Sequence, residues 1–116
     1  MNRAATLLQQ IGQEVQPEVQ KQLAGLFGGF VRTYLPQAWV FETNHGTATL
    51  LVDAKGVVSV EEGAVERPDV TLKVPYEPLV HALKTKSKMS PDAVTVTPHT
   101  AKGRTAFDYL RGRFGL

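Results

Sequence analysis

The stretch PDVTLKVPYEPLVHAL, residues 68–83, changes its hydrophobic period near its middle. Before the first internal proline, apolar and polar side chains alternate, which is the two-residue period of a strand with one buried face. After Pro75 the apolar residues recur at Leu79 and Leu83, which is helical spacing. Proline ends a strand ladder and is tolerated in a first helical turn, so Pro75 and Pro78 suit a junction. The stretch therefore predicts a half-buried strand that runs almost directly into a short amphipathic helix.

The rest of the chain shows the same two periods. Five segments alternate as strands, at residues 38–43, 47–53, 57–61, 70–74 and 93–97. Turn residues at 44–46 and 53–56 join the first three into an antiparallel meander. A short helix is expected over residues 4–14, and Pro17 is expected to open a second, strongly apolar helix that Pro36 ends. A last helix is expected to open near Gly103.

This order of elements predicts an α+β fold with a sheet of about five strands, mostly antiparallel. The helices are expected to cover one face of the sheet. The other face carries threonine, serine and charged side chains, Thr49 and Lys73 among them, so it is expected to face solvent. At 116 residues the chain is expected to be a single domain, residues 1–116.

Composition narrows the classes of function. The chain has no cysteine, which removes disulfides and thiolate chemistry. No run approaches the ~20 apolar residues that a membrane span needs, so a cytoplasmic protein is expected. Residues 84–116 carry seven basic and two acidic groups, whereas residues 1–83 carry six basic and nine acidic ones. The basic end is either a solvated face or a surface for an anionic partner such as a membrane.

The sequence shows no convergent catalytic set. His45, His81 and His99 have no metal-ligand spacing, and the serines have no nucleophile elbow. No phosphate-binding loop occurs, so no cofactor and no metal are expected. Nucleic acid is not expected as a partner, because the aromatic residues fall on predicted buried faces and leave the KTKSK segment without a stacking platform. Binding is favoured over catalysis; an enzyme acting through His81 or His99 is the least favoured alternative.

Three segments together resemble the sterol carrier protein type two family of lipid-binding domains. They are the meander AWVFETNHGTATLLVDAKGVVSVEEG, the stretch ERPDVTLKVPYEPLVHAL and the closing helix TAKGRTAFDYLRGRF. The resemblance spans roughly residues 18–114 and rests on the order of elements. It implies that a fatty acid, a fatty acyl-coenzyme A or a sterol-like lipid is held between the helices and the sheet without covalent chemistry.

The resemblance also implies a set of site residues. The inward-facing apolar residues expected to line a lipid cavity, each of which would otherwise be ordinary core, are Phe27, Phe30, Val31, Trp39, Phe41, Leu50, Val52, Leu72, Val74, Leu79, Leu83, Phe107 and Leu110. The basic residues expected to hold a carboxylate or phosphate head group are Lys84, Lys86, Lys88, Lys102 and Arg104. Free backbone N–H groups near Gly103 would assist them.

Two hypotheses follow. The first is a carrier of a lipid-like small molecule, which an interior without a cavity would contradict. The second is an accessory domain on the same fold, supporting an enzyme of lipid or isoprenoid metabolism or forming a homodimer through the segment GLFGGFVRTYL. A monomer without a large exposed apolar patch would count against the second.

Overall fold

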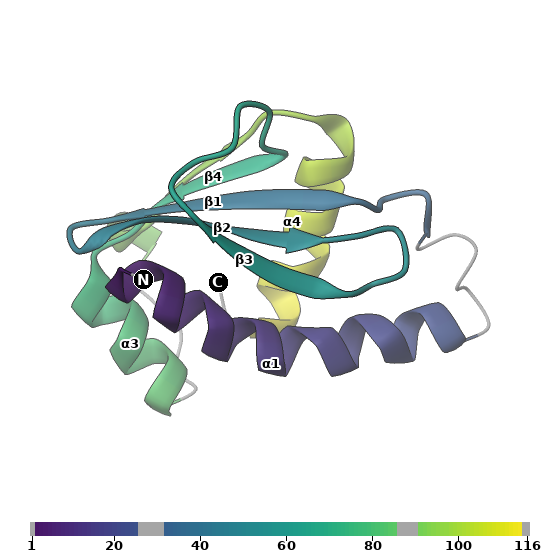
Figure 1. Ribbon diagram of the computed structural model, residues 1–116, viewed down its shortest axis with the longest axis horizontal. Coiled ribbons are helices and arrows are strands. Elements are labelled where there is room, and N and C mark those ends of the chain that lie inside the picture. Colours follow the sequence, from purple (N-terminus) through teal and green to yellow (C-terminus); the bar gives the residue numbers. More distant parts are fainter. Residues whose placement is uncertain (1, 26–31, 86–90, 115–116) are drawn as a thin grey trace.

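The computed structural model of the chain describes residues 2–25, 32–85 and 91–114, with Gln22, Pro91 and residues 109–114 as backbone only. The described elements, in chain order, are α1 (Arg3–Ala24), β1 (Gln37–Thr43), β2 (Gly46–Val52), β3 (Val58–Glu62), β4 (Val70–Lys73), α3 (Tyr76–Thr85), the 3-10 turn η1 (Pro91–Ala93), β5 (Thr95–Pro98) and α4 (Ala101–Phe114). This is the predicted α+β class, and Figure 1 shows α1 and α3 on the same side of the sheet.

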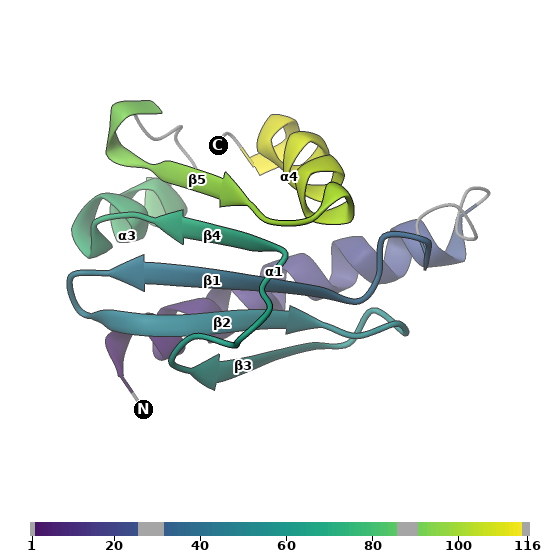
Figure 2. The ribbon, with the colours of Figure 1, turned by 90° about the horizontal axis from the view of Figure 1, so that it is seen from above.

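The five strands form one sheet in the order β3-β2-β1-β4-β5, with β1 at its centre. The predicted meander of β1, β2 and β3 is confirmed as antiparallel, and β5 pairs antiparallel with β4. The pairing of β1 with β4 is parallel and places Phe41 opposite Leu72. A tight turn cannot join strands in this way. The chain therefore crosses the sheet between β3 and β4, as Figure 2 shows.

One continuous helix, α1, stands where the sequence predicts two helices separated at Pro17. Proline inside a helix removes a backbone hydrogen bond and costs about 3 kcal/mol. Here the exposed Pro17 lies between two packed halves of a helix that runs along β2 and β3. In the half before Pro17, Leu8 is buried. In the half after Pro17, Leu23 lies close to Gly56, where an added Cβ would be 2.7 Å from Leu23 Cδ1. The predicted break is wrong because packing on the sheet stabilises both halves.

The core lies on the sheet face that the helices cover, called the covered face below. Its buried apolar members are Ala4, Ala5, Leu7, Leu8, Trp39, Phe41, Ala48, Leu50, Val70, Leu72, Val74 and Leu79. The inward alternation predicted for β1, β2 and β4 is confirmed. α1 covers β2 and β3, whereas α4 contacts β4 and β5. The inward side of β1 therefore lies between two helices that cover different strands.

The opposite face of the sheet is less exposed to solvent than the sequence predicts. Thr49 and Val40 point to this face and are 0% and 1% exposed. The loop between β3 and β4 crosses in front of β2 and β1 (Figure 2). It is bonded to β2, because the Thr49 hydroxyl donates to the Gly63 carbonyl at 2.8 Å and the Gly63 N–H donates to the Thr47 carbonyl at 2.8 Å. The prediction of a wholly solvated face is wrong because the parallel β1–β4 pairing requires this crossover.

The strand-to-helix junction forms as the quoted stretch predicts. β4 ends at Lys73, and α3 begins at Tyr76, directly after Pro75. The side chain of Asn44, in the turn between β1 and β2, accepts the Tyr76 N–H at 2.8 Å and so satisfies one of the free donors of the helix start. The ring of His45 meets the Tyr76 ring edge-on, with 5.0 Å between centroids. Contacts with the hairpin turn therefore hold the first turn of α3.

Candidate functional site

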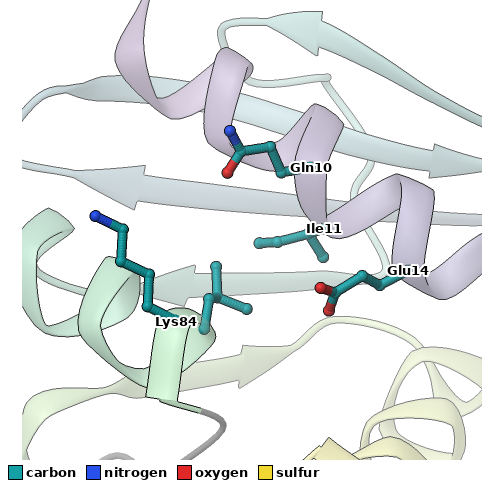
Figure 3. Close-up of a pocket in the computed structure, with 5 residues that line it drawn as sticks. Gln10, Ile11, Glu14 and Lys84 are labelled. Carbon is teal, nitrogen blue, oxygen red and sulfur yellow. The ribbon is translucent and has the colours of Figure 1, made fainter.

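A pocket lies on the covered side of the molecule between α1 and the last turn of α3. It has a volume of about 210 Å³ and opens to solvent. Its described lining residues, which define the α1–α3 pocket, are Gln10, Ile11, Glu14, Leu83 and Lys84. Figure 3 shows Gln10, Ile11 and Glu14 projecting from α1, with Lys84 on the helix that faces them.

Helical spacing explains why these residues meet. Gln10 and Glu14 are four residues apart and lie on one side of α1, with Ile11 between them. Leu83 follows the buried Leu79 by four residues, so both lie on the inward side of α3. The pocket therefore has an apolar centre and a polar rim.

The rim carries opposite charges on opposite helices. Glu14 belongs to α1 and Lys84 to α3, and both side chains are exposed. The side chains of Gln10, Glu14 and Lys84 have no hydrogen bond or ion pair with another residue in the part of the chain that the structure describes. Their donors and acceptors are therefore available to a ligand.

Partly buried apolar side chains pack against the core cluster. They come from α1, β3, α3, β5, α4 and the loop before β5, and they are Ile11, Val58, Val60, Tyr76, Val80, Leu83, Val94, Val96, Ala106 and Phe107. Partial burial means that each contacts the core on one side and retains some solvent contact on the other. Of this set, Ile11 and Leu83 line the α1–α3 pocket, so its apolar surface borders the core cluster.

The structure divides the predicted apolar site residues into three groups. Those that are buried and pack within the protein are Trp39, Phe41, Leu50, Val52, Leu72, Val74 and Leu79. Leu83 and Phe107 are partly buried, and Leu83 lines the pocket. The positions outside the described side chains are Phe27, Phe30, Val31 and Leu110, so the predicted helix through GLFGGF also lies outside the described residues.

The predicted basic residues do not gather in one place. Lys84 lines the pocket, whereas Lys102 lies at the start of α4, where its ammonium donates to the Pro36 carbonyl at 2.6 Å. Arg104 is exposed in the first turn of α4. Lys86 and Lys88 lie outside the described residues. Of the described basic residues predicted for a head group, Lys84 alone lines the α1–α3 pocket.

The start of α4 is occupied by protein groups rather than open to an anion. Thr100 precedes the helix, and its hydroxyl oxygen accepts the Gly103 N–H at 3.0 Å. The expectation of a free Gly103 N–H is therefore wrong. The glycine has a packing role, because a Cβ at this position would lie 2.4 Å from the Asp69 carbonyl oxygen.

Asp69 is the centre of a polar cluster at this helix start, called the α4 junction and defined by Gln37, Asp69, Thr100 and Lys102. The buried Asp69 carboxylate accepts the Ala38 N–H at 2.9 Å and the Thr100 hydroxyl at 2.7 Å. Lys102 Nζ lies 3.8 Å from the same carboxylate. These contacts join β1, β4 and α4, so Asp69 has a structural role.

Gln37 completes the α4 junction and connects it to the core. Its amide nitrogen donates to the carbonyls of Tyr34, at 2.6 Å, and Lys102, at 3.1 Å. Its amide oxygen accepts the Trp39 indole N–H at 2.9 Å. The Trp39 ring in turn packs against Phe107, with 5.9 Å between centroids. The sequence signal for this cluster is weak, because a single glutamine at a strand start has no distinctive spacing.

A second hollow lies at the far end of α1. It has a volume of about 350 Å³, and its described lining is Gln20, Leu23, Ala24, Arg32, Ala54 and Lys55. It is larger than the α1–α3 pocket, and its described lining has three polar and three apolar residues, with Leu23 as the one large apolar side chain among them. The α1–α3 pocket borders the core cluster, so it is the better candidate for an apolar ligand.

The histidines show no catalytic arrangement in the described ranges. His81 is exposed on α3, and the His99 ring Nε2 lies 2.8 Å from the Thr71 hydroxyl, which belongs to the opposite face of the sheet. Across residues 2–25, 32–85 and 91–114, no three histidine, aspartate or glutamate side chains come together as metal ligands would. None of the helices in these ranges has the length and apolar content needed to cross a membrane.

Comparison with solved structures identifies the fold. The crystal structure of sterol carrier protein 2 like 2 from Aedes aegypti matches with a TM-score of 0.53 and 17% identity, covering 89% of this chain and 94% of that one. The chain therefore has the sterol carrier protein 2 fold, as its resemblance to that family predicts. No protein-family model and no curated protein matches the sequence.

Two further structures show lower similarity. The ubiquinone synthesis protein UbiJ-SCP2 matches with a TM-score of 0.48 and 11% identity, over 90% of this chain and 97% of that one. The sec-alkylsulfatase Pisa1 from Pseudomonas sp. matches with a TM-score of 0.49 and 16% identity. That match covers 65% of this chain and 13% of the alkylsulfatase.

Sequence reasoning missed the contribution of α1 to the pocket. Ile11 belongs to the apolar side of the predicted helix 4–14, but no signal indicated that Gln10 and Glu14 would face Lys84. The periodicity of α1 identifies its apolar side. It does not identify the helix that lies opposite.

Proposed function

We propose that this chain, residues 1–116, is a domain that binds or carries a hydrophobic ligand, with the apolar part of the ligand in the α1–α3 pocket. The observation that carries the proposal is a solvent-open pocket whose centre is apolar, formed by Ile11 and Leu83, and which borders the core cluster. The fold supports it, since the structure that shares it is named as a sterol carrier protein.

Burial separates residues that would contact a ligand from residues that support the site. Side chains such as Leu72, 2% exposed, and Val74, 4% exposed, already have apolar neighbours and gain little from a ligand. The half-buried Leu83 and Ile11, which line the pocket, still expose apolar surface, and covering it contributes about 25 cal/mol for each Å² removed from water. The proposal therefore assigns ligand contact to the half-buried set and support to the buried set.

The alternative role as an accessory domain has less support. It depends on the segment GLFGGFVRTYL, of which residues 26–31 lie outside the described part of the chain. Among the residues whose exposure the structure describes, Val57 is the one exposed large apolar side chain, at 46%. A single such residue does not form an extended docking patch.

The test compares two tryptophan substitutions on α1. Ile11→Trp fills the α1–α3 pocket, whereas the matched control Leu23→Trp fills the second hollow on the same helix. Ligands extracted from the purified proteins are identified by mass spectrometry, and affinity is measured by displacement of a fluorescent fatty acid. Excluding two ligand methylenes from the pocket costs about 1.6 kcal/mol, so Ile11→Trp is expected to weaken binding about tenfold or more.

The control is expected to bind as the unchanged protein does, and thermal unfolding shows whether both variants remain folded. If only Leu23→Trp loses binding, the ligand binds in the second hollow and not in the α1–α3 pocket. Absence of any extracted ligand, together with absence of fluorescent fatty acid binding to the unchanged protein, would reject the proposal.

A further inference from the structure

We propose that the turn between β1 and β2 controls how tightly the α1–α3 pocket binds its ligand, although this turn is absent from the described lining of the pocket. Asn44 and His45 in the turn act as positioning residues, because they contact the start of α3, and α3 carries Leu83 in the pocket. The inference rests on the proposed function and adds a control on the same site.

The two helices that form the pocket are packed on the protein to different extents. α1 lies along β2 and β3, and its buried apolar residues are Ala4, Ala5, Leu7, Leu8 and Val15. In α3, Leu79 is the one buried residue among residues 76–85, all of which the structure describes. Buried apolar area is the main source of packing energy, so α3 is the less firmly held of the two helices. Its position therefore depends more on the contacts at its start.

Those contacts come from the turn between β1 and β2, which Figures 1 and 2 both show beside the start of α3. Asn44 Oδ1 accepts the Tyr76 N–H at 2.8 Å, and the His45 ring meets the Tyr76 ring edge-on at 5.0 Å between centroids. Within the described part of the chain, no other hydrogen bond and no ion pair joins residues 76–84 to a position outside residues 75–85. The turn thus supplies the polar anchor of α3.

Leu83 lies at a fixed distance from this anchor. It follows Tyr76 by seven residues, so the two lie on the same side of α3, about 10 Å apart along the helix axis. Both pack against the core cluster. A tilt of α3 by about 10° at Tyr76 would move Leu83 by about 2 Å. Since a gap of about 1 Å already removes much of a van der Waals contact, such a tilt would separate Leu83 from a bound ligand.

Ligand binding and the position of α3 are therefore coupled. A ligand that contacts both Ile11 and Leu83 binds tightly only to molecules in which α3 is in place. The measured affinity falls in proportion to the fraction of such molecules. One side-chain hydrogen bond at a helix start changes an equilibrium by up to about fivefold. Loss of the Asn44 acceptor is thus expected to weaken binding and to speed ligand release.

The experiment measures the dissociation constant and the dissociation rate of a fluorescent fatty acid, NBD-labelled dodecanoate. The proteins compared are the unchanged chain, Asn44→Ala, Asn44→Asp and Asp53→Ala. Asn44→Asp keeps an oxygen that can accept the Tyr76 N–H, and its negative charge is favourable at a helix start. Asp53→Ala is the matched control, because Asp53 accepts the N–H groups of Lys55 and Val57 in the other turn of the meander. Urea denaturation gives the stability of each variant.

We expect Asn44→Ala to bind about two- to fivefold more weakly, with faster release, and Asn44→Asp to bind as the unchanged chain does. Asp53→Ala is expected to lose a similar amount of stability and to keep its affinity, which a purely structural role of Asn44 would not produce. Unchanged affinity in Asn44→Ala, or equal losses of affinity in Asn44→Ala and Asp53→Ala, overturns this inference and leaves the proposed function standing. Failure of the unchanged chain to bind overturns both.

The ring contact gives a second test that leaves the Asn44 hydrogen bond in place. His45→Phe keeps an aromatic edge against Tyr76, whereas His45→Ala removes it. His45→Ala is expected to weaken binding by about twofold or more, and His45→Phe to retain the affinity of the unchanged chain. Equal affinities in the two variants would overturn the role of His45.

Discussion

The α4 junction and the α1–α3 pocket use similar side chains in opposite ways. At the α4 junction, the buried Asp69 carboxylate has three neighbours of complementary polarity. At the pocket, the exposed side chains of Glu14 and Lys84 have no hydrogen bond or ion pair with another residue in the described part of the chain. A buried carboxylate without partners would cost several kcal/mol, whereas an exposed one is solvated by water. The junction therefore stabilises the fold, whereas the charged side chains at the pocket remain open to solvent.

From this comparison, we expect removal of the Asp69 carboxylate to lower the free energy of unfolding more than any change at the pocket. Asp69→Ala leaves the Ala38 N–H and the Thr100 hydroxyl without their acceptor, so the free energy of unfolding is expected to fall by about 3 kcal/mol. Urea denaturation measures this change. The control is Asp53→Ala, because Asp53 accepts the backbone N–H groups of Lys55 and Val57 in an exposed turn.

The control is expected to cost about 1 kcal/mol, as the loss of an exposed side-chain cap does. Equal losses in Asp69→Ala and Asp53→Ala would contradict the view that the α4 junction is a structural centre.

A smaller loss of stability is expected from Gly103→Ala, at the same helix start. Alanine in a helix interior normally stabilises by up to about 1 kcal/mol relative to glycine. Here the added Cβ would lie 2.4 Å from the Asp69 carbonyl oxygen, so the backbone must shift. A net loss of about 2 kcal/mol is expected, measured by urea denaturation.

Gly12→Ala on α1 is the matched comparison, since its Cβ would meet the Val58 side chain at 2.9 Å rather than backbone. A side chain can move more easily, so a loss below about 1 kcal/mol is expected for this variant. A gain of stability in Gly103→Ala would show that α4 is not held tightly against β4.

The smallest effect on stability is expected at the pocket. Leu83→Ala removes a half-buried side chain and is expected to cost about 1 kcal/mol, whereas Leu79→Ala, at a position 6% exposed on the same helix, is expected to cost about 2–3 kcal/mol. Ligand affinity should show the reverse order, with the greater loss in Leu83→Ala. Thermal unfolding and fluorescent fatty acid binding on the same samples measure both quantities. A larger loss of affinity in Leu79→Ala would place the ligand deeper than the α1–α3 pocket.

Much of the architecture could be predicted because its signals are local. Alternation in the quoted stretch predicted β4, and the helical spacing after Pro75 predicted α3. Turn residues predicted the meander of β1, β2 and β3. Alternation predicted β5, although the structure places it at Thr95–Pro98, slightly later than residues 93–97. Strand ends are less certain than strand existence, since pairing with β4 decides where the ladder stops.

The errors arose where packing outweighs local preference. Pro17 reads as a helix boundary in sequence, yet contacts of α1 with β2 and β3 hold the helix together through it. Thr49 reads as a solvent-facing residue, yet the loop from β3 to β4 covers it. The sequence predicts free N–H groups at Gly103, yet the Gly103 N–H donates a hydrogen bond to the Thr100 hydroxyl oxygen. Each outcome depends on a segment distant in sequence.

The sequence by itself determined the strand and helix periods, the apolar side of each element and the absence of cysteine chemistry, because these depend on the order and identity of neighbouring residues. The tertiary structure decided which apolar side chains became core and which stayed half-buried. It also brought Glu14 on α1 opposite Lys84 on α3, although 69 positions separate them in the printed sequence. The physical reason is that a pocket is the space left between packed elements. Periodicity specifies which way a side chain points, whereas the distance to the facing element is set by the packing of the whole fold.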